Sequence, residues 1–309
     1  MKKHLLALAF IPLFAMTACC HVNKAPAQPP KITVTYPDWK LKALSFSYDD
    51  GVIEDRELVK IFDRYNIKAT FNVSLGKAVK KPERFIQVPE IKTLYKNHEV
   101  ASHGYLHRTM TLLGDRSLDE EIGRNQEEIA KVLGNPPPGF VYPYGRHTSK
   151  KAPTRIYEAL AKHKLVYART CKKAGNFDLP QDFIQWHPYC HHNYASDAAQ
   201  KFLDSKAEKM SVLIIWGHSY EFRAYVNKKT GKPIKASWHV IENICKKLAN
   251  KPDIWYATMG DIALYVNASR KLAFSGDGRK LTNNSDRTIY FLCNGKQKSI
   301  APGKTLEVK

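Results

Sequence analysis

Two histidines separated by three residues, His103 and His107, could hold one metal ion, because imidazoles at positions i and i+4 share one face of a helical turn. A hydrolytic metal bound by two histidines usually takes a carboxylate as third ligand and leaves a position open for water. The adjacent Asp49 and Asp50 offer one carboxylate for the metal and one to accept a proton. Beside Gly51 they would also suit a solvated turn, but the histidine pair makes us favour the metal interpretation.

Short apolar runs alternate with helical patterns between residues 43 and 258. The runs predict strands at 43–48, 68–74, 99–102, 140–142, 165–169, 212–216 and 254–258. Helices are expected at about 54–65, 88–97, 117–133, 154–164 and 237–249, the third with a capping box at Ser117 and Glu120. This alternation predicts parallel strands joined by crossovers, and therefore an α/β fold, a distorted (β/α) barrel of about seven units.

Four polar clusters each follow directly after one of these strands. They are Asp49-Asp50, His103-Gly104, Pro143-Tyr144-Gly145 and His218. In (β/α) barrels, residues after the carboxyl ends of the strands gather on one face of the molecule. The sequence therefore predicts that these clusters form one site.

The same segments resemble four motifs of the polysaccharide deacetylase family, the NodB homology domain of carbohydrate esterase family 4. The resemblance covers about residues 40–265. Its first motif, T-F-D-D-G, is similar to residues 46–51, and its second, H-[ST]-x-x-H, is similar to residues 103–107 with Gly104 in place of Ser or Thr. The third, F-R-P-P-Y-G, is similar to residues 140–145, and the fifth is similar to residues 213–218 and ends at His218.

The resemblance implies a role for each conserved position of these motifs. Asp49 would be the general base that activates the attacking water, and His218 the general acid that protonates the leaving amine. The backbone N–H of Tyr144 would help the metal to stabilise the oxyanion. A divalent transition metal, expected to be zinc, would be held by Asp50, His103 and His107.

Aromatic residues near the expected face could bind sugar rings, although each could equally belong to the core. The residues that we expect to bind substrate are Tyr142, Pro143, Trp186 and Trp216. A second histidine cluster contains His187, His191 and His192. We interpret it as a polar rim of the sugar cleft or as loop histidines, with a second metal site as the alternative.

Three positions depart from the family pattern. Val141 stands where the third motif has the arginine that braces the base, and either Arg146 or Arg169 could substitute for it. Trp216 replaces the leucine expected two residues before His218. The fourth motif, D-x-x-D-W, is only loosely similar to residues 178–186. These departures support one alternative of another class, a catalytically silent wall-binding protein on the same fold.

The first residues are typical of an export signal. Lys2 and Lys3 precede an apolar run at 5–16, too short to span a membrane, so we expect a signal peptide at 1–18. Residues 16–19 resemble a lipobox that would attach lipid to Cys19, ordinary cleavage being the alternative. Either route predicts a protein of the periplasm or cell envelope, in contact with a membrane only through that anchor. A Pro-rich linker is expected at 19–36.

The remaining chain divides into a barrel domain at 37–268 and a small β appendage at 269–309, which we expect to pack on the barrel. The 309 residues carry a net charge of +20, or +18 once residues 1–18 with Lys2 and Lys3 are removed. The surplus favours an anionic partner, and export without a basic repeat argues against nucleic acid. Export also permits a disulfide, for which Cys171 and Cys190 are the expected pair.

Together these observations predict metal-dependent N-deacetylation of an N-acetylhexosamine polymer, with peptidoglycan N-acetylglucosamine as the first choice of substrate. Chitooligosaccharide, an exopolysaccharide and O-acetylated xylan are the alternatives, since the same machinery would serve each of them.

Overall fold

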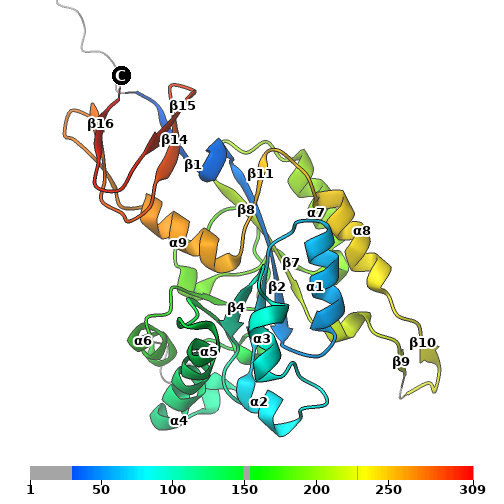
Figure 1. Cartoon of the computed structure of the whole chain (residues 1–309). Helices are drawn as coiled ribbons and strands as arrows, with labels where there is room; N and C mark the ends of the chain where they lie inside the picture. Colours follow the sequence, from blue (N-terminus) through cyan, green and yellow to red (C-terminus); the bar gives the residue numbers. More distant parts are fainter. Residues whose placement is uncertain (1–29, 149–153, 228, 309) are drawn as a thin grey trace, which may run out of the picture.

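The computed structural model describes residues 30–148, 154–227 and 229–308 (Figure 1). The expected signal peptide at 1–18, the candidate lipid site Cys19 and most of the expected linker at 19–36 lie outside these ranges. No helix within them has both the length and the apolar composition that a membrane crossing requires.

A curled parallel sheet forms the centre of the molecule. Among the described residues it has eight strands, in the order β6-β5-β4-β3-β2-β8-β7, with β11 paired to the first residues of β2. The strands are β2 (Lys42–Asp50), β3 (Ala69–Val73), β4 (Glu99–Ser102), β5 (Gly139–Val141), β6 (Tyr167–Arg169), β7 (Cys190–His191), β8 (Ser211–Gly217) and β11 (Ile254–Tyr256). This confirms the predicted α/β class and distorted barrel. Because the strands are parallel, their carboxyl ends meet at one face.

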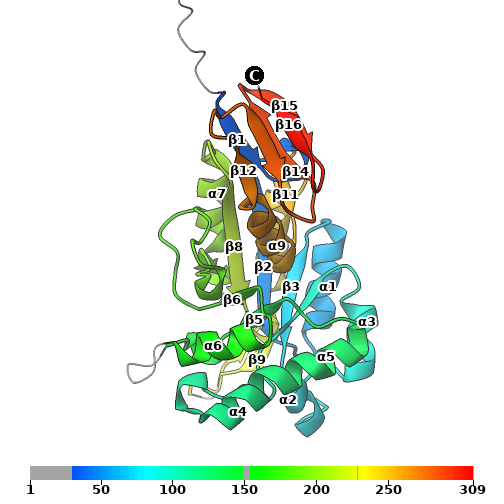
Figure 2. The same ribbon diagram turned by 90° about the vertical axis from the view of Figure 1, so that its left-hand side faces the viewer.

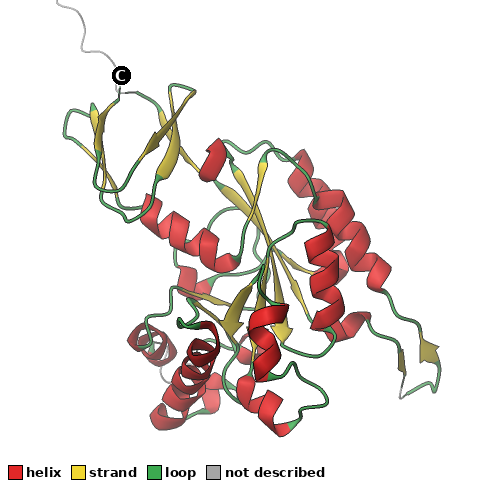
Figure 3. Ribbon diagram, in the orientation of Figure 1, coloured by secondary structure: helices red, strands yellow, loops and turns green. Residues whose placement is uncertain are grey.

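Helices surround this sheet (Figure 3). They are α1 (Asp55–Arg64), α2 (Leu75–Lys80), α3 (Val88–Leu94), α4 (Asp115–Asp119), α5 (Asn125–Leu133), α6 (Arg155–Lys162), α7 (Ala195–Asp204), α8 (Trp238–Leu248) and α9 (Met259–Ser269). In α1 the predicted apolar face is buried, since Leu58, Ile61 and Phe62 are each at most 2% exposed. These side chains pack against the strands and so hold the end of β2 in place.

Three helical features differ from the expectation. The helix expected to start at a capping box begins instead at Asp115, with Gly114 as N-cap and no side-chain cap. Between α4 and α5 the chain forms a π-helical turn at Glu120–Arg124. The helices α2, α7 and α9 were not predicted. The mostly apolar α9 lacks a clear polar face, whereas α7 is amphipathic and its pattern was missed.

The carboxy-terminal appendage consists of two three-stranded sheets at the end of the molecule where β2 begins (Figures 1 and 2). They contain β1 (Ile32–Thr35), β12 (Leu272–Phe274), β13 (Lys280–Asn283), β14 (Ile289–Cys293), β15 (Lys296–Ile300) and β16 (Thr305–Glu307). Residues 32–35, assigned to the linker from sequence, thus form a strand paired with β14. Tyr265 of α9 joins the appendage to the barrel, because its hydroxyl donates to Thr35 O at 2.7 Å.

The expected disulfide is absent: Cys171 and Cys190 are both thiols. Cys190 is buried in β7, where burial raises the pKa of its thiol to about 12. Cys171 follows β6 and lies beside the Arg169 guanidinium, 4.0 Å from Nη1.

Candidate active site

The two aspartates lie where β2 ends against β3. Asp49 is 2% exposed, whereas Asp50 has a left-handed backbone with φ of 82°. Gly51 continues this turn with φ of 66°, and a Cβ there would lie 2.9 Å from Val73 Cγ1. Successive side chains of a regular strand point to opposite faces. The left-handed turn ends that alternation, and both carboxylates act on the pKa of His103.

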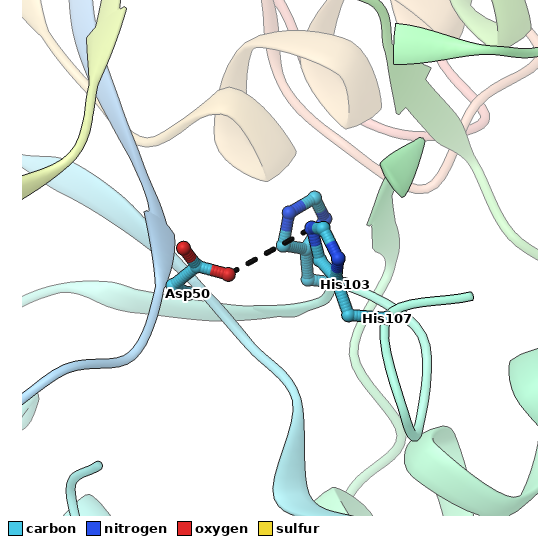
Figure 4. Close-up of side chains that lie close together, drawn as sticks. All are labelled: Asp50, His103 and His107. Carbon is cyan, nitrogen blue, oxygen red and sulfur yellow. Dashed lines mark ion pairs between the residues drawn. The ribbon is translucent and has the colours of Figure 1, made fainter. Parts of the chain in front are cut away.

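Asp50, His103 and His107 come together as predicted (Figure 4). Their candidate ligand atoms lie within 4.8 Å of one another, and His107 Nε2 is 3.7 Å from Asp50 Oδ1. His103 Nδ1 donates to Val141 O at 2.8 Å, which leaves Nε2 unprotonated as a ligand. One carboxylate and two imidazoles, one of them fixed by a backbone carbonyl, are a donor set that suits a divalent transition metal.

The two histidines are not on a helix, which corrects the geometry assumed from their spacing. They flank a loop in which Gly104 and His107 both have positive φ, 76° and 58°. Glu121, from the π-helical turn, holds this loop by accepting the backbone N–H groups of Leu106 and Arg108 at 2.9 and 2.8 Å. A Cβ at Gly104 would lie 2.9 Å from Glu121 Oε1, which explains glycine in place of Ser or Thr.

Lys77 is a member of the site that the sequence analysis did not find. Its Nζ lies 3.0 Å from Asp50 Oδ1, the oxygen that also faces His107. Burial of Asp50 favours its neutral form, but His103, Lys77 and His107 outweigh this and lower the pKa of Asp50 to about 2. Asp50 is therefore an anion at neutral pH and can act as a metal ligand.

The arginine that contacts the base is Arg169. Its Nη2 donates to Asp49 Oδ1, and its Nε donates to Ser47 Oγ at 2.9 Å. Asn72 Nδ2 donates to the same Asp49 oxygen at 2.8 Å. Burial raises the pKa of Asp49, but Arg169, His103 and His218 outweigh burial and lower it below the usual range.

Strand pairing explains how Arg169 can replace the third-motif arginine that is missing at Val141. Val141 of β5 and Arg169 of β6 are register partners, so Arg169 projects from the strand adjacent to the third motif. Arg146, the other candidate, is exposed. The Arg169 guanidinium, by contrast, is fully buried. Arg169 rather than Arg146 therefore takes the place of the arginine that is missing at Val141.

His218 pairs with Glu221, another residue that the sequence analysis missed. His218 Nδ1 donates to Glu221 Oε1 at 2.6 Å, which leaves Nε2 free to transfer a proton. Burial lowers the pKa of His218, but the Glu221 hydrogen bond and the charges of Asp49 and Asp50 outweigh it and raise that pKa above its usual value. The three-residue separation of His218 and Glu221 within one turn was the available sequence signal.

The second histidine cluster is divided in the structure. His191 Nε2 and His192 Nε2 each lie 3.3 Å from a Glu221 oxygen, so both support the partner of His218. His187 lies elsewhere, with Nδ1 2.6 Å from Thr170 Oγ1. The loose fourth motif contributes no contact to His218, because Asp182 caps a turn at Ile184 N and Asp178 pairs with Lys209.

Three of the four residues expected to bind sugar are buried. Tyr142 and Trp186 are at most 2% exposed, and Pro143 is also buried. The Tyr142 hydroxyl donates to Ile184 O at 2.8 Å, and Trp186 packs against Tyr167 and Phe183. Their aromatic character therefore serves the core, which corrects the sugar-stacking expectation.

Two aromatic residues do line the site. Trp216 is partly exposed and lies between Arg169 and His218, with ring-centroid separations of 5.0 Å to the guanidinium and 5.8 Å to the imidazole. Tyr144 is 63% exposed, and its ring is 4.6 Å from that of His107. The left-handed backbone of Tyr144, with φ of 58°, places this residue at the edge of the site.

The fold is similar to that of several solved structures. A protein from Mycobacterium smegmatis assigned to the polysaccharide deacetylases is 19% identical, with a TM-score of 0.55 over 80% of this chain and 96% of that one. One from Pseudomonas aeruginosa PAO1 is 15% identical, with a TM-score of 0.53 over 74% and 91%. A PuuE allantoinase is 14% identical, with a TM-score of 0.53 over 77% and 93%. At these identities the likeness concerns the fold.

No curated protein matches the chain. A family model does match it, over residues 38–167, and that model is described as polysaccharide deacetylase. The matched segment includes both aspartates, both metal-candidate histidines and Tyr144, whereas Arg169 and His218 lie beyond it. The predicted resemblance is thus confirmed over residues 38–167, which match the polysaccharide deacetylase family model.

Proposed function

We propose that the protein is a metal-dependent deacetylase that removes acetyl groups from an N-acetylated glycan, with peptidoglycan N-acetylglucosamine as substrate. The observation that carries the proposal is the grouping of a base held by Arg169, an acid held by Glu221 and a set of three candidate metal ligands. The pKa of Asp49 is lowered and that of His218 is raised. Environments that separate two such values in this way assign one group as base and the other as acid.

The residues divide the reaction between them. Asp49, ionised and held by Arg169, takes a proton from the water that attacks the acetamide carbonyl carbon. His218, protonated and held by Glu221, gives a proton to the nitrogen as the carbon–nitrogen bond breaks. Acetate and a free amine result. Zinc, held by Asp50, His103 and His107, would supply Lewis acidity towards the carbonyl oxygen.

An active enzyme is a better interpretation than a silent barrel. The absence of the third-motif arginine was the main argument for a silent protein, and Arg169 now makes that contact from β6. A buried Arg–Asp pair next to a metal-ligand group is also expensive to maintain without a catalytic use. Export to the cell envelope remains part of the proposal and rests on the first 18 residues.

The test is acetate release from N-acetylglucosamine polymers, measured together with bound metal by elemental analysis. We expect zinc at about one ion per chain and turnover that a chelator abolishes and zinc restores. Asp49→Asn should lose turnover but keep the metal, since it removes a base and not a ligand. Asp50→Asn and His107→Ala should lose most of the metal.

Equal loss of metal in the Asp49 and Asp50 variants would contradict the division of roles. A wild-type chain that binds zinc but releases no acetate from peptidoglycan, chitooligosaccharide or acetylated xylan would support the silent wall-binding alternative. Faster release from acetylated xylan would make the enzyme an O-deacetylase.

A further inference from the structure

A basic hairpin arm, residues 223–235, follows the catalytic histidine in the chain. It contains β9 (Tyr225–Val226) and β10 (Pro233–Ile234), which pair antiparallel, and it projects from the molecule between β8 and α8 (Figure 1). Between the two strands, Asn227 Oδ1 accepts the backbone N–H of Lys229 at 2.9 Å. The arm sequence has five basic residues, Arg223, Lys228, Lys229, Lys232 and Lys235, and no Asp or Glu.

A hollow of about 820 Å³ separates this arm from the catalytic acid. Tyr220 and Glu221 line its inner side, and Tyr225 and Lys229 line its outer side. The ring of Tyr220 is 4.9 Å from that of His218. Two of its lining residues, Tyr220 and Glu221, therefore contact His218, and the volume of the hollow lies within the range of ordinary ligand pockets.

Arg223 and Lys229 are the basic lining residues of the hollow, and Lys232 and Lys235 add positive charge elsewhere on the arm. Glu221 is the one acidic lining residue of the hollow in the described part of the chain, and that carboxylate already faces three imidazoles. Arg223 is paired with Glu54 at 2.8 Å. Within the described ranges Lys229, Lys232 and Lys235 take part in no ion pair, so their charges remain available to a ligand.

We propose that the arm and its hollow bind a carboxylate-bearing sugar that neighbours the N-acetylated sugar in the active site. This proposal rests on the proposed function. If His218 acts on an N-acetylated sugar, the next sugar of the same glycan strand lies close enough to enter the hollow beside His218. The ring of Tyr225, 48% exposed, offers a face for a sugar ring, and the lysines offer charge for its carboxylate. The substrate class is thus an acidic, N-acetylated glycan rather than a neutral one.

The test compares two glycans of equal length. One is a neutral N-acetylglucosamine oligomer, and the other alternates N-acetylglucosamine with a carboxylated sugar. The measured quantity is the ratio of kcat/KM for the acidic glycan to that for the neutral one, at low ionic strength so that exposed charges are not screened. Wild type should prefer the acidic glycan.

The arm variant Lys229→Gln/Lys232→Gln/Lys235→Gln should lower this ratio about tenfold, the combined effect expected of three exposed charge pairs. The matched control Lys280→Gln/Lys296→Gln/Lys298→Gln removes the same charge from exposed positions of the appendage. It should leave the ratio within about twofold of wild type, because those strands lie at the other end of the barrel (Figure 1). An equal fall in both variants would overturn the proposal, since charge would then act as a property of the whole molecule.

Calorimetric binding of both glycans to the Asp49→Asn chain separates this proposal from the proposed function. Suppose that wild type releases no acetate from any glycan, but that the Asp49→Asn chain binds the acidic glycan at least tenfold more tightly with the arm lysines than with glutamines in their place. The arm proposal then stands and the deacetylase proposal fails. If the arm substitutions leave binding of the acidic glycan unchanged, the arm proposal is wrong whatever the turnover. Tighter binding to anionic lipid vesicles than to the acidic glycan also overturns it.

Discussion

Glu221 is the residue on which the acid side of the site depends. Its carboxylate accepts from His218 and faces His191 and His192, and these three histidines lower its pKa far below the usual range against the opposing effect of burial. It is therefore an anion at neutral pH. An anion at this position keeps the neighbouring imidazole protonated to a higher pH than in water.

Glu221→Gln should move the alkaline limb of the kcat/KM profile to lower pH. His218 has a raised pKa and must be protonated to act, so activity is lost as pH rises through that pKa. Removing the anion lowers the pKa and brings the loss on earlier. The measurement is the pH dependence of acetate release between pH 5 and 10, with bound zinc recorded for each sample.

The matched control for that prediction is Asp182→Asn. Asp182 is the carboxylate that the sequence would place in the fourth motif, but the structure uses it to cap Ile184 N. The control should keep the wild-type profile. A shift of equal size in both variants would show that Glu221 has no special coupling to the acid.

At the scale of elements, strand register decides which side chain reaches the base. Val141 and Arg169 are partners across β5 and β6, so an arginine on either strand would project from the same level of the sheet. The family pattern has it on the first strand and this chain has it on the second. The contact with Asp49 is retained although its position in the sequence has moved by 28 residues.

Arg169→Met should abolish turnover and destabilise the fold by about 3–5 kcal/mol, because it leaves the buried Asp49 charge without its partner. Adding Val141→Arg to that variant should restore part of both losses, since the new guanidinium starts from the register partner. Urea unfolding and acetate release measure the two effects. Arg146→Met, at an exposed position, is the control and should change stability by less than about 0.5 kcal/mol.

The sequence predicted those features that depend on one segment at a time. Strands ending in Asp49-Asp50, His103 and His218 carry their own apolar runs, so the barrel and the residues at its carboxyl face could be inferred. Partners from other elements could not. Lys77 reaches Asp50 from α2, and Glu121 reaches the histidine loop through a π-helical turn that no simple periodicity indicates. Helical spacing misled us at Gly104, whose positive φ is visible only in three dimensions.

For the molecule as a whole, one buried carboxyl links elements around the site. Asp55, at the start of α1, accepts from the Tyr95 hydroxyl at 2.7 Å and from Ser219 Oγ at 2.5 Å. Burial raises its pKa to about 7, although both hydrogen bonds oppose the shift. The folded state therefore holds this proton more tightly than the unfolded chain does.

The contribution of Asp55 to stability should consequently fall as pH rises from about 4 to about 7. A carboxyl whose pKa is raised on folding contributes stability below its unfolded pKa, and that contribution is lost as pH rises through the folded pKa. A shift from 3.8 to about 7 corresponds to up to about 4 kcal/mol at 1.36 kcal/mol per pKa unit. Asp55→Asn keeps a neutral polar group and should remove this contribution, so the difference in stability between wild type and variant should change across this pH range.

Urea unfolding of both proteins at intervals between pH 4 and 8 measures the difference. Glu57→Gln, a comparable change at a side chain of the same helix that is 44% exposed, is the control and should follow the wild-type curve, because its surface pair with Lys60 adds little to stability. Parallel curves for wild type and Asp55→Asn would mean that the buried carboxyl ionises without penalty.

The strand β1 enters the fold within the appendage, at the end of the barrel opposite the carboxyl ends of the strands (Figures 1 and 2). If Cys19 carries a lipid, the chain is anchored to the membrane at the end of the molecule that lies opposite the candidate active site. The dozen residues between Cys19 and β1 extend at most about 40 Å. The length of this segment and the length of the folded part together limit the distance between the bilayer and the active site. The active site would then face away from the membrane, and glycan strands at the membrane surface would be the least accessible to it. Shortening or lengthening the segment between Cys19 and β1 would change which layer of the envelope the active site reaches, without changing the residues of that site.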